Sequence, residues 1–185
     1  MNSSAPWPAG LDVRRAAPAD RLPLQRMLEL YQHDLSDIWD QDLDVHGEFG
    51  YALDRYWRDP ACVPHVFTVG EAYAGFALVD NAVKLPGGQH WMDQFFVMRK
   101  YRRRGVGAAA AAVVFAAHPG RWQVGQMTAN LAAQAFWRRT ISACTGGRFT
   151  EDALGTGWWQ GVVQCFEIAP GADNCPSEPF AQPAR

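Results

Sequence analysis

The chain has 185 residues, a length typical of one domain, and a formal net charge of −2. Proteins that bind nucleic acid generally carry a basic excess, so this balance argues against that class of partner. The sequence holds no run of the ~20 apolar residues that a membrane-spanning helix needs. The N-terminus lacks the basic and apolar parts of a signal peptide, so we expect a cytoplasmic protein with no membrane partner.

The cysteines carry little information about function. Their spacing matches no zinc ligand set and includes no C-x-x-C pair. We therefore expect four reduced thiols and no metal site. The four are Cys62, Cys144, Cys165 and Cys175.

The first third of the chain predicts one strand and two helices. Residues 11–15 alternate apolar and polar side chains, as a short strand does. Apolar residues then recur at helical spacing and predict an amphipathic helix over residues 19–39. An acidic turn follows at 40–47, and the spacing of Phe49, Leu53, Tyr56 and Trp57 predicts a second short helix.

The remaining elements alternate between strands and helices. Strands are predicted at 63–69, 71–80, 90–98, 121–127, 148–153 and 158–168, and helices at 106–117 and 129–144. This order predicts an α/β fold, with a mixed sheet of about seven strands and helices on both faces. Residues 1–10 and 170–185 are rich in Pro, Ala, Ser and Gly, so we expect disordered tails around one domain at 11–169.

The most informative segment runs from Phe95 to Gly107, with the sequence FFVMRKYRRRGVG. A predicted strand leads through a basic turn with two glycines into a predicted helix. The N–H groups and dipole at a helix start attract anions, glycines let the main chain approach a pyrophosphate, and arginines donate to phosphate oxygens. The segment lacks the pattern of a P-loop and the third glycine of a dinucleotide fingerprint. It predicts a phosphate site, although basic runs seen alone are more often solvated patches.

Two motifs together resemble a known family. The order strand, Arg102-x-x-Gly105-x-Gly107, helix resembles motif A of the GNAT superfamily of N-acetyltransferases, whose pattern is Q/R-x-x-G-x-G/A. After one further strand, Asn130 to Trp137 resembles the N-x-x-A-x-x-F/L-Y stretch that opens the next helix of the family. The resemblance covers the element order from residue 11 to 168. It implies a GNAT-like fold with a splay between the fourth and fifth strands.

The resemblance also implies a co-substrate, acetyl-CoA, and no metal. The loop from Arg102 to Gly107 would cradle the pyrophosphate, and backbone groups of Val97 and Met98 would hold the pantetheine arm within the splay. The residues expected to contact acetyl-CoA are Val97, Met98, Arg102, Arg103, Arg104, Gly105, Val106, Gly107, Ala108, Asn130, Ala133, Phe136 and Trp137.

Acetyl transfer to an amine needs a base for the amine proton and a donor that polarises the thioester carbonyl. Asp93 is the first candidate for the base, because strand alternation puts it on one face with Phe95 and Val97. A solvent-facing aspartate at a strand start is the alternative. A backbone N–H at Val97 is the candidate carbonyl donor. Weaker candidates for the base are Glu71, His90 and Tyr31.

One position departs from the family pattern. The family often has a tyrosine seven residues after the asparagine, where it protonates the leaving thiolate. This chain has Trp137 there, and an indole does not donate a proton at neutral pH. We therefore expect Trp137 to act by packing.

The acceptor is less visible in the sequence. Acidic residues concentrate around the first two predicted helices and favour a cation, such as a primary amine of a small molecule or peptide with a second positive charge. A solvated acidic turn explains the same pattern. The residues expected to bind the acceptor are Tyr31, Asp34 and Asp37.

The sequence thus predicts an acyl-CoA-dependent N-acyltransferase that uses direct attack in a ternary complex. The alternative is a non-catalytic module that binds acyl-CoA as a sensor or scaffold, which the missing tyrosine favours slightly. A domain that binds nucleic acid through the basic run is a third reading, and the net charge speaks against it. A homodimer is one arrangement that the sequence leaves open.

Overall fold

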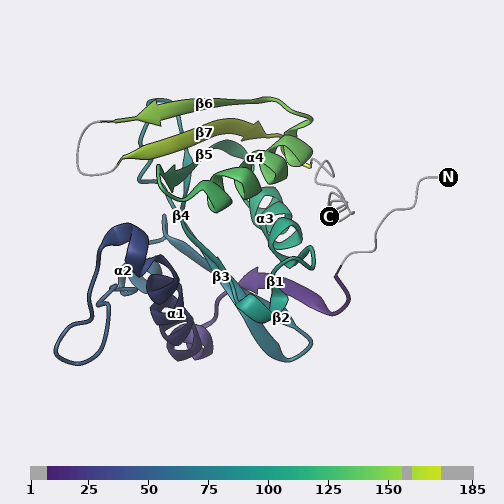
Figure 1. Ribbon diagram of the computed structural model, residues 1–185. Coiled ribbons are helices and arrows are strands. Elements are labelled where there is room, and N and C mark those ends of the chain that lie inside the picture. The colour runs from purple at the N-terminus through teal and green to yellow at the C-terminus, as the bar shows by residue number, and fades with distance from the viewer. Residues whose placement is uncertain (1–7, 156–159, 172–185) are drawn as a thin grey trace.

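The computed structural model describes residues 8–155 and 160–171, and it contains one seven-stranded sheet in the order β1-β2-β3-β4-β5-β7-β6 (Figure 1). The strands are β1 (Leu11–Arg15), β2 (Val63–Val69), β3 (Ala72–Asp80), β4 (His90–Val97), β5 (Gly120–Met127), β6 (Phe149–Leu154) and β7 (Gly161–Ile168). The helices are α1 (Arg21–Trp39), α2 (Arg55–Arg58), α3 (Val106–Ala117) and α4 (Leu131–Thr145), with 3₁₀ turns at Pro18–Asp20 and Arg99–Tyr101. The mixed α/β fold predicted from the sequence is confirmed.

The sheet opens between its two central strands. β4 and β5 run parallel but pair only where His90–Met92 faces Trp122–Val124. By contrast, β5 pairs with β7 over its whole length, and β4 pairs with β3 up to Val97. The ends of β4 and β5 beyond Met92 and Val124 therefore diverge. This is the splay that the resemblance implied between the fourth and fifth strands.

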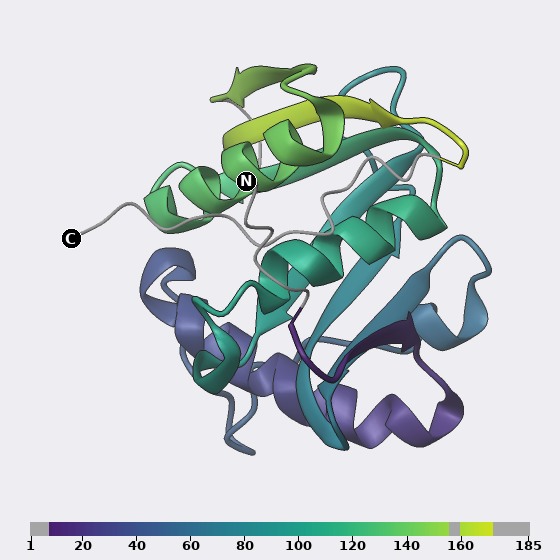
Figure 2. The same ribbon diagram turned by 90° about the vertical axis from the view of Figure 1, so that its right-hand side faces the viewer.

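Two apolar cores cover the two faces of the sheet. One lies beneath α1 and α2 and includes Leu24, Leu28 and Phe76. The other lies beneath α3 and α4 and includes Phe115 and Trp122. Figure 2 shows α3 lying across the sheet, where its alanines permit close approach to the strands. Helices thus cover both faces, as predicted.

The connection from α1 to α2 is mostly irregular. The second predicted helix is limited to Arg55–Arg58, and the segment before it turns at Gly47 and Gly50, both with φ of 75°. These left-handed conformations break a helix that the spacing from Phe49 onward favoured. Asp54 and Arg58, one helical turn apart, form an ion pair at 3.7 Å.

The structure differs from the sequence expectations at one end of the chain and at one cysteine. Residues 1–7 and 172–185 of the predicted tails, and Trp158 and Trp159 of the last predicted strand, lie outside the described residues. Gly10 accepts a hydrogen bond from the Gly70 N–H at 2.8 Å, so the first predicted tail is ordered at its end. The expectation of four reduced thiols is wrong at Cys144, which is disulfide-bonded.

Candidate functional site

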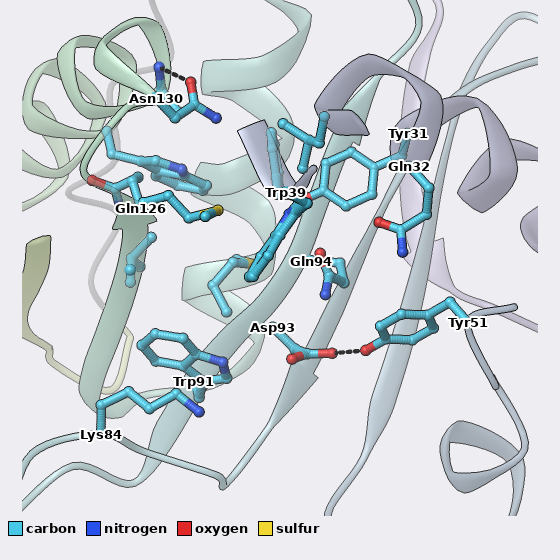
Figure 3. Close-up of a pocket in the computed structure, with 18 of the residues that line it drawn as sticks. Tyr31, Gln32, Trp39, Tyr51, Lys84, Trp91, Asp93, Gln94, Gln126 and Asn130 are labelled. Carbon is cyan, nitrogen blue, oxygen red and sulfur yellow. Dashed lines mark hydrogen bonds between the residues drawn. The ribbon is translucent and has the colours of Figure 1, made fainter. Parts of the chain in front are cut away.

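The splay opens into a cavity of about 410 Å³ between α1, β4, β5 and α4. Figure 3 shows that side chains from both faces of the sheet meet there. The cavity is lined by Tyr31, Gln32, Leu35, Trp39, Gln41, Tyr51, Lys84, Trp91, Met92, Asp93, Gln94, Phe95, Val124, Gly125, Gln126, Met127, Asn130, Ala133 and Trp137. Of the predicted site residues, the cavity brings together Asp93, Tyr31 and three residues at the start of α4 and in it. The roles of these residues in binding acetyl-CoA or the acceptor remain predictions.

Asp93 lies at an irregularity of β4. Leu78 pairs with Gln94, and the next residue, Val79, pairs with Met92, so Asp93 has no partner on β3. Such a bulge inserts an extra residue and re-aims the side chains around it. The expectation that Asp93 shares a face with Phe95 and Val97 is therefore wrong. Its side chain points to the face covered by α1 and α2.

Three donors converge on one oxygen of Asp93. The Tyr51 hydroxyl donates to Oδ2, the Tyr56 hydroxyl does so at 2.7 Å, and an Arg55 guanidinium nitrogen lies 2.9 Å away. Figure 3 shows the other carboxylate oxygen directed away from Tyr51. These contacts fix the carboxylate and leave one oxygen on the cavity side.

Burial and the Asp93 charge keep the two tyrosines protonated. Burial, together with the neighbouring carboxylate, raises the pKa of Tyr51 and of Tyr56 well above the usual range. Both phenols therefore donate to Asp93 at neutral pH. Behind them lies Asp80, which is 1% exposed and accepts from Arg55 at 2.6 Å, and its pKa is raised by burial.

The loop before α3 presents backbone donors. Gly105 precedes the helix in a left-handed conformation, with φ of 78°, and Arg103 has φ of 60°. The first turn of α3 has no side-chain cap and no acidic residue. The N–H groups of Val106, Gly107 and Ala108 are therefore at an uncapped helix start, the arrangement that binds phosphate. Arg103 and Arg104 are exposed beside it.

Gly107, in the first turn of α3, faces Phe136 on α4 and Val97 on β4. A Cβ added there would stand 3.3 Å from the Phe136 ring and 3.5 Å from Val97. The glycine thus leaves a space between these elements that a Cβ would fill. Phe136 lies against this point and outside the cavity lining.

Arg102 is exposed, but its guanidinium group is bound by other groups of the protein. Its Nε donates to the Val97 carbonyl at 2.6 Å, and its Nη2 pairs with Asp34 on α1. Arg99 binds the other oxygen of Asp34 at 2.8 Å. Burial alone would raise the pKa of Asp34, but these arginines hold it below its ordinary value. Asp34 therefore ties α1 to the phosphate loop.

The backbone of β4 distinguishes Val97 from Met98. The Met98 N–H donates to the Ala74 carbonyl at 2.9 Å, and its carbonyl accepts from the Tyr101 N–H at 2.8 Å. Both backbone groups of Met98 are used, so the expectation that they hold the pantetheine arm is not supported. Because successive N–H groups of a strand point to opposite sides, the Val97 N–H points away from β3 and toward the splay.

The α4 wall is built around its first turn. The Asn130 side chain caps α4 by accepting from the Ala133 N–H at 3.1 Å. Trp137, two turns on, is 5% exposed and packs edge-on against Phe95 at 4.9 Å. Asn130, Ala133 and Trp137 line the cavity, and their contact with acetyl-CoA, which the resemblance implied, stays a prediction.

A chain of polar side chains runs inward from the surface and ends at the buried Gln126 on β5. Arg138 holds Glu151 through two hydrogen bonds, Glu151 accepts from Gln164 Nε2 at 2.9 Å, and Gln126 Nε2 donates to Gln164 Oε1 at 2.8 Å. The carboxylate fixes the direction of the chain, so Gln126 must present its amide N–H to Gln164. Its Oε1 is buried and has no hydrogen-bond partner among the described residues. A buried unpaired acceptor is costly, and a ligand N–H would satisfy it.

The predicted acceptor residues separate in the structure. Tyr31 lines the cavity and packs against Phe76 and Phe96, and burial raises its pKa. Asp34 is engaged by arginines and Asp37 is exposed, and neither lines the cavity. The geometry of the cavity therefore does not favour these two carboxylates as acceptor residues.

Two of the three weaker candidates for the base, Glu71 and His90, lie outside the cavity lining. Glu71 is exposed in the turn between β2 and β3, and it does not line the cavity. His90 lies 3.1 Å from the Pro119 carbonyl at the opposite end of β4 from Val97. Asp93 is thus the cavity carboxylate that the sequence had singled out.

Sequence reasoning missed most of the partners of Asp93. Tyr51, Arg55 and Tyr56 come from the α1–α2 segment, about 40 positions earlier, and no short motif links them to Asp93. A weak signal for Asp80 is a charged residue that directly ends the apolar run of β3. Lys84 and Trp91 at the cavity were missed for the same reason.

Neither a metal nor a membrane helix is found in the part of the chain that the structure describes. No group of three or more His, Cys, Asp or Glu side chains there is arranged to hold a metal ion. No helix within residues 8–155 and 160–171 combines the length and apolarity required to cross a membrane.

Comparison with known proteins places the geometry in context. Residues 24–141 match the sequence model of the acetyltransferase (GNAT) family. A comparison with curated proteins gives no match.

Solved structures resemble the whole domain. An acetyltransferase from Thermus thermophilus is 16% identical, with 87% of this chain and 99% of that chain covered at a TM-score of 0.64. YncA from Salmonella typhimurium, with its cofactor acetyl-CoA, is 14% identical over 89% and 98% of the two chains at 0.58. The ribosomal-protein-S18-alanine N-acetyltransferase from Escherichia coli is 14% identical over 89% and 97% at 0.55. At these identities, the likeness shows the fold.

Proposed function

The chain belongs to the GNAT acetyltransferase family, and we propose that it transfers an acetyl group from acetyl-CoA to a primary amine bound beside Asp93. The observation that carries this proposal is the position of Asp93. Its carboxylate is fixed by Tyr51, Arg55 and Tyr56 and lines a cavity that opens through the splay. The amine therefore has a base on one side and access to a thioester on the other.

Three features of this chain fit acetyl-CoA. The uncapped start of α3 offers backbone N–H groups to the pyrophosphate. Gly107 leaves the space that a Cβ would fill beside Phe136. The unpaired Oε1 of Gln126 offers an acceptor for an amide N–H, such as those of the pantetheine arm.

The chemical step requires one proton transfer before attack. In the proposal, Asp93 accepts a proton from the bound ammonium, and the neutral nitrogen attacks the thioester carbonyl carbon. The new C–N bond forms as the C–S bond breaks, and CoA leaves as a thiolate. Because Asp93 already holds the first proton, the nitrogen loses its second proton to the leaving thiolate or to solvent, which gives a neutral amide.

The developing oxyanion needs a donor inside the splay. The N–H of Val97 points away from β3, whereas that of Met98 is bound to Ala74. We assign the oxyanion contact to Val97 for this reason. Trp137 lies on the α4 side of the cavity and excludes water by packing against Phe95.

The test is an acceptor screen with detection of free CoA thiol. Purified protein and acetyl-CoA are incubated with primary amines, and with alcohols of the same carbon skeleton. We expect thiol release with the amines, matched mole for mole by an N-acetyl product in mass spectrometry. Release with alcohols but not amines would contradict the proposal. Acetyl-CoA binding without any acceptor-dependent release would favour the non-catalytic alternative.

A further inference from the structure

The charged side chains of the cavity wall are few and opposite. Among its lining residues, all within the described chain, Asp93 is the one carboxylate and Lys84 the one positively charged side chain. The other polar side chains are amides, hydroxyls or indoles. A bound molecule therefore meets one negative and one positive group.

The main chain beside Lys84 is held firmly. Gln123 is 2% exposed, and its Oε1 accepts from the N–H groups of Lys84 at 2.8 Å and of Leu85 at 3.0 Å. Its Nε2 donates to the Leu85 carbonyl at 2.7 Å. One buried amide thus fixes the loop before β4 against β5. The backbone at Lys84 is therefore fixed by hydrogen bonds to Gln123.

Lys84 and Asp93 lie on the same side of the sheet, with Trp91 beside them. The Lys84 Nζ stands 4.9 Å from the centre of the Trp91 ring. Trp91 pairs with Asp80, whose side chain joins the Arg55 and Tyr56 cluster around Asp93. Figure 3 shows Lys84, Trp91 and Asp93 along one wall of the cavity.

Aromatic rings form much of the remaining wall on this side. Tyr31, Trp39 and Tyr51 come from α1 and the segment after it, and Trp39 is 40% exposed. A large indole so exposed at a cavity is suited to cover an apolar group of a ligand. The wall therefore combines a carboxylate, an ammonium group and an apolar surface.

We propose that the acceptor is a free amino acid with an apolar or aromatic side chain. Its ammonium group faces Asp93, its carboxylate faces Lys84, and its side chain lies against Trp39 and Tyr31. This inference rests on the proposed function and names the acceptor class for that site. Lys84 disfavours a dicationic acceptor by like-charge repulsion, and a peptide N-terminus lacks the adjacent carboxylate. The second positive charge expected from the acidic sequence cluster is therefore replaced by a negative one.

The first experiment uses matched pairs of acceptors. Phenylalanine is compared with phenethylamine, tryptophan with tryptamine, and leucine with 3-methylbutylamine, by thiol release at saturating acetyl-CoA. Each pair differs only in the carboxylate. We expect the amino acid to have the lower KM by about tenfold to 100-fold, because one charge pair is worth that much in a partly buried site.

Variants at Lys84 test whether this side chain supplies the preference. Lys84→Met is expected to remove the KM advantage of the amino acids and to change KM for the carboxylate-free amines less than about threefold. Lys84→Arg keeps the charge and is expected to retain the preference. The chain has one other lysine, Lys100, whose Nζ also lies over an aromatic ring, Tyr101, but outside the cavity lining. Lys100→Met is therefore the matched control, with an unchanged acceptor KM.

A binding measurement separates Lys84 from general effects on folding. Reductive ¹³C-methylation labels both lysines without removing their charge, and NMR then follows each methyl signal. Phenylalanine is expected to shift the Lys84 signal and leave that of Lys100 in place, while phenethylamine shifts neither strongly. Equal shifts at both lysines would contradict the assignment.

The possible failures are distinguishable. If the carboxylate-free amines are acetylated as well as the amino acids, or if Lys84→Met impairs both equally, the amino-acid inference is overturned while N-acetyl transfer stands. If no member of any pair releases thiol although acetyl-CoA binds, both the inference and the proposed function fail.

Discussion

The loop before α3 and the wall around Asp93 lie on two sides of one splay, yet they present different parts of the chain. The loop offers backbone N–H groups from one continuous segment, with Gly105 and Gly107 shaping it. The wall offers side chains from α1, the α1–α2 segment, the β3–β4 loop and β4. Substitutions at the loop should therefore act on acetyl-CoA binding, and those at the wall on acceptor binding and proton transfer.

The largest effect is expected at the centre of the wall. Asp93→Asn removes the proposed base and should lower kcat/KM for the amine by ~10²–10⁴ at neutral pH. The loss should shrink at alkaline pH, where solution supplies neutral amine. Initial rates across a pH series measure both, with Asp12→Asn on exposed β1 as the control. A variant within threefold of the parent would remove Asp93 from this role and favour a water relay.

Substitutions in the loop before α3 should change acetyl-CoA binding and not proton transfer. Acetyl-CoA at ~100 times its dissociation constant should stabilise the fold by about 2.7 kcal/mol, which a thermal-shift assay detects. Gly107→Glu should abolish this shift, because the side chain enters the space beside Phe136 and its charge opposes the pyrophosphate. Tyr51→Phe, on the wall, should keep it. No shift in the parent protein, or a shift retained by Gly107→Glu, would break the division between the two regions.

The same division explains which parts of the site the sequence predicted. The phosphate loop is local, so Arg102, Gly105 and Gly107 signal it within a few positions and in front of a helix. The order of strands and helices, and the covering of both faces, also follow from periodic patterns. The cluster of Tyr51, Arg55 and Asp80 around Asp93 depends on tertiary pairing, which no local spacing reveals.

Two departures from prediction have clear physical causes. The bulge in β4 leaves Asp93 without a partner on β3, and a strict period of two cannot foresee it. Asp34 has the charge expected of an acceptor site, but the fold brings Arg99 and Arg102 onto it. In both cases the residue type could be judged from the sequence, but the groups around it depend on tertiary contacts that the sequence does not reveal.

A third prediction concerns the pH dependence of stability, which must be separated from titration of groups in the site. At the far end of the sheet, His65 and His118 share a hydrogen bond of 2.9 Å between their Nε2 atoms. Burial, with His118 and Arg15 nearby, lowers the pKa of His65 to about 4 from an ordinary value of 6.5, and burial, with His90 and Arg15 nearby, also lowers that of His118. The unfolded chain thus binds protons that the folded chain resists, so stability falls as the pH drops from about 6.5 toward 4.

The expected loss is of the order of 2 kcal/mol over that range, and chemical denaturation at several pH values measures it. His65→Leu should flatten the pH dependence, whereas His33→Gln on exposed α1 should leave it unchanged. If stability stays constant between pH 6.5 and 4, acid inactivation must be assigned to the site itself.

The smallest effect on the reaction is expected for Trp137→Phe, because Trp137 acts by packing at the cavity and in the core. It lines the cavity from α4, and its ring also packs against Phe95 and Phe115 in the core beneath α3. A thiol of ordinary pKa, ~8.5, leaves acceptably as a thiolate, so the site does not need an acid at this position. Trp137→Phe keeps an aromatic wall and should retain kcat within about threefold. Trp137→Ala opens a cavity that costs about 3–5 kcal/mol of stability and should raise KM for acetyl-CoA more than it lowers kcat. Steady-state kinetics with a melting curve for each variant separate these terms. A large loss of kcat in Trp137→Phe, with unchanged KM and Tm, would mean that the indole N–H takes part in the reaction.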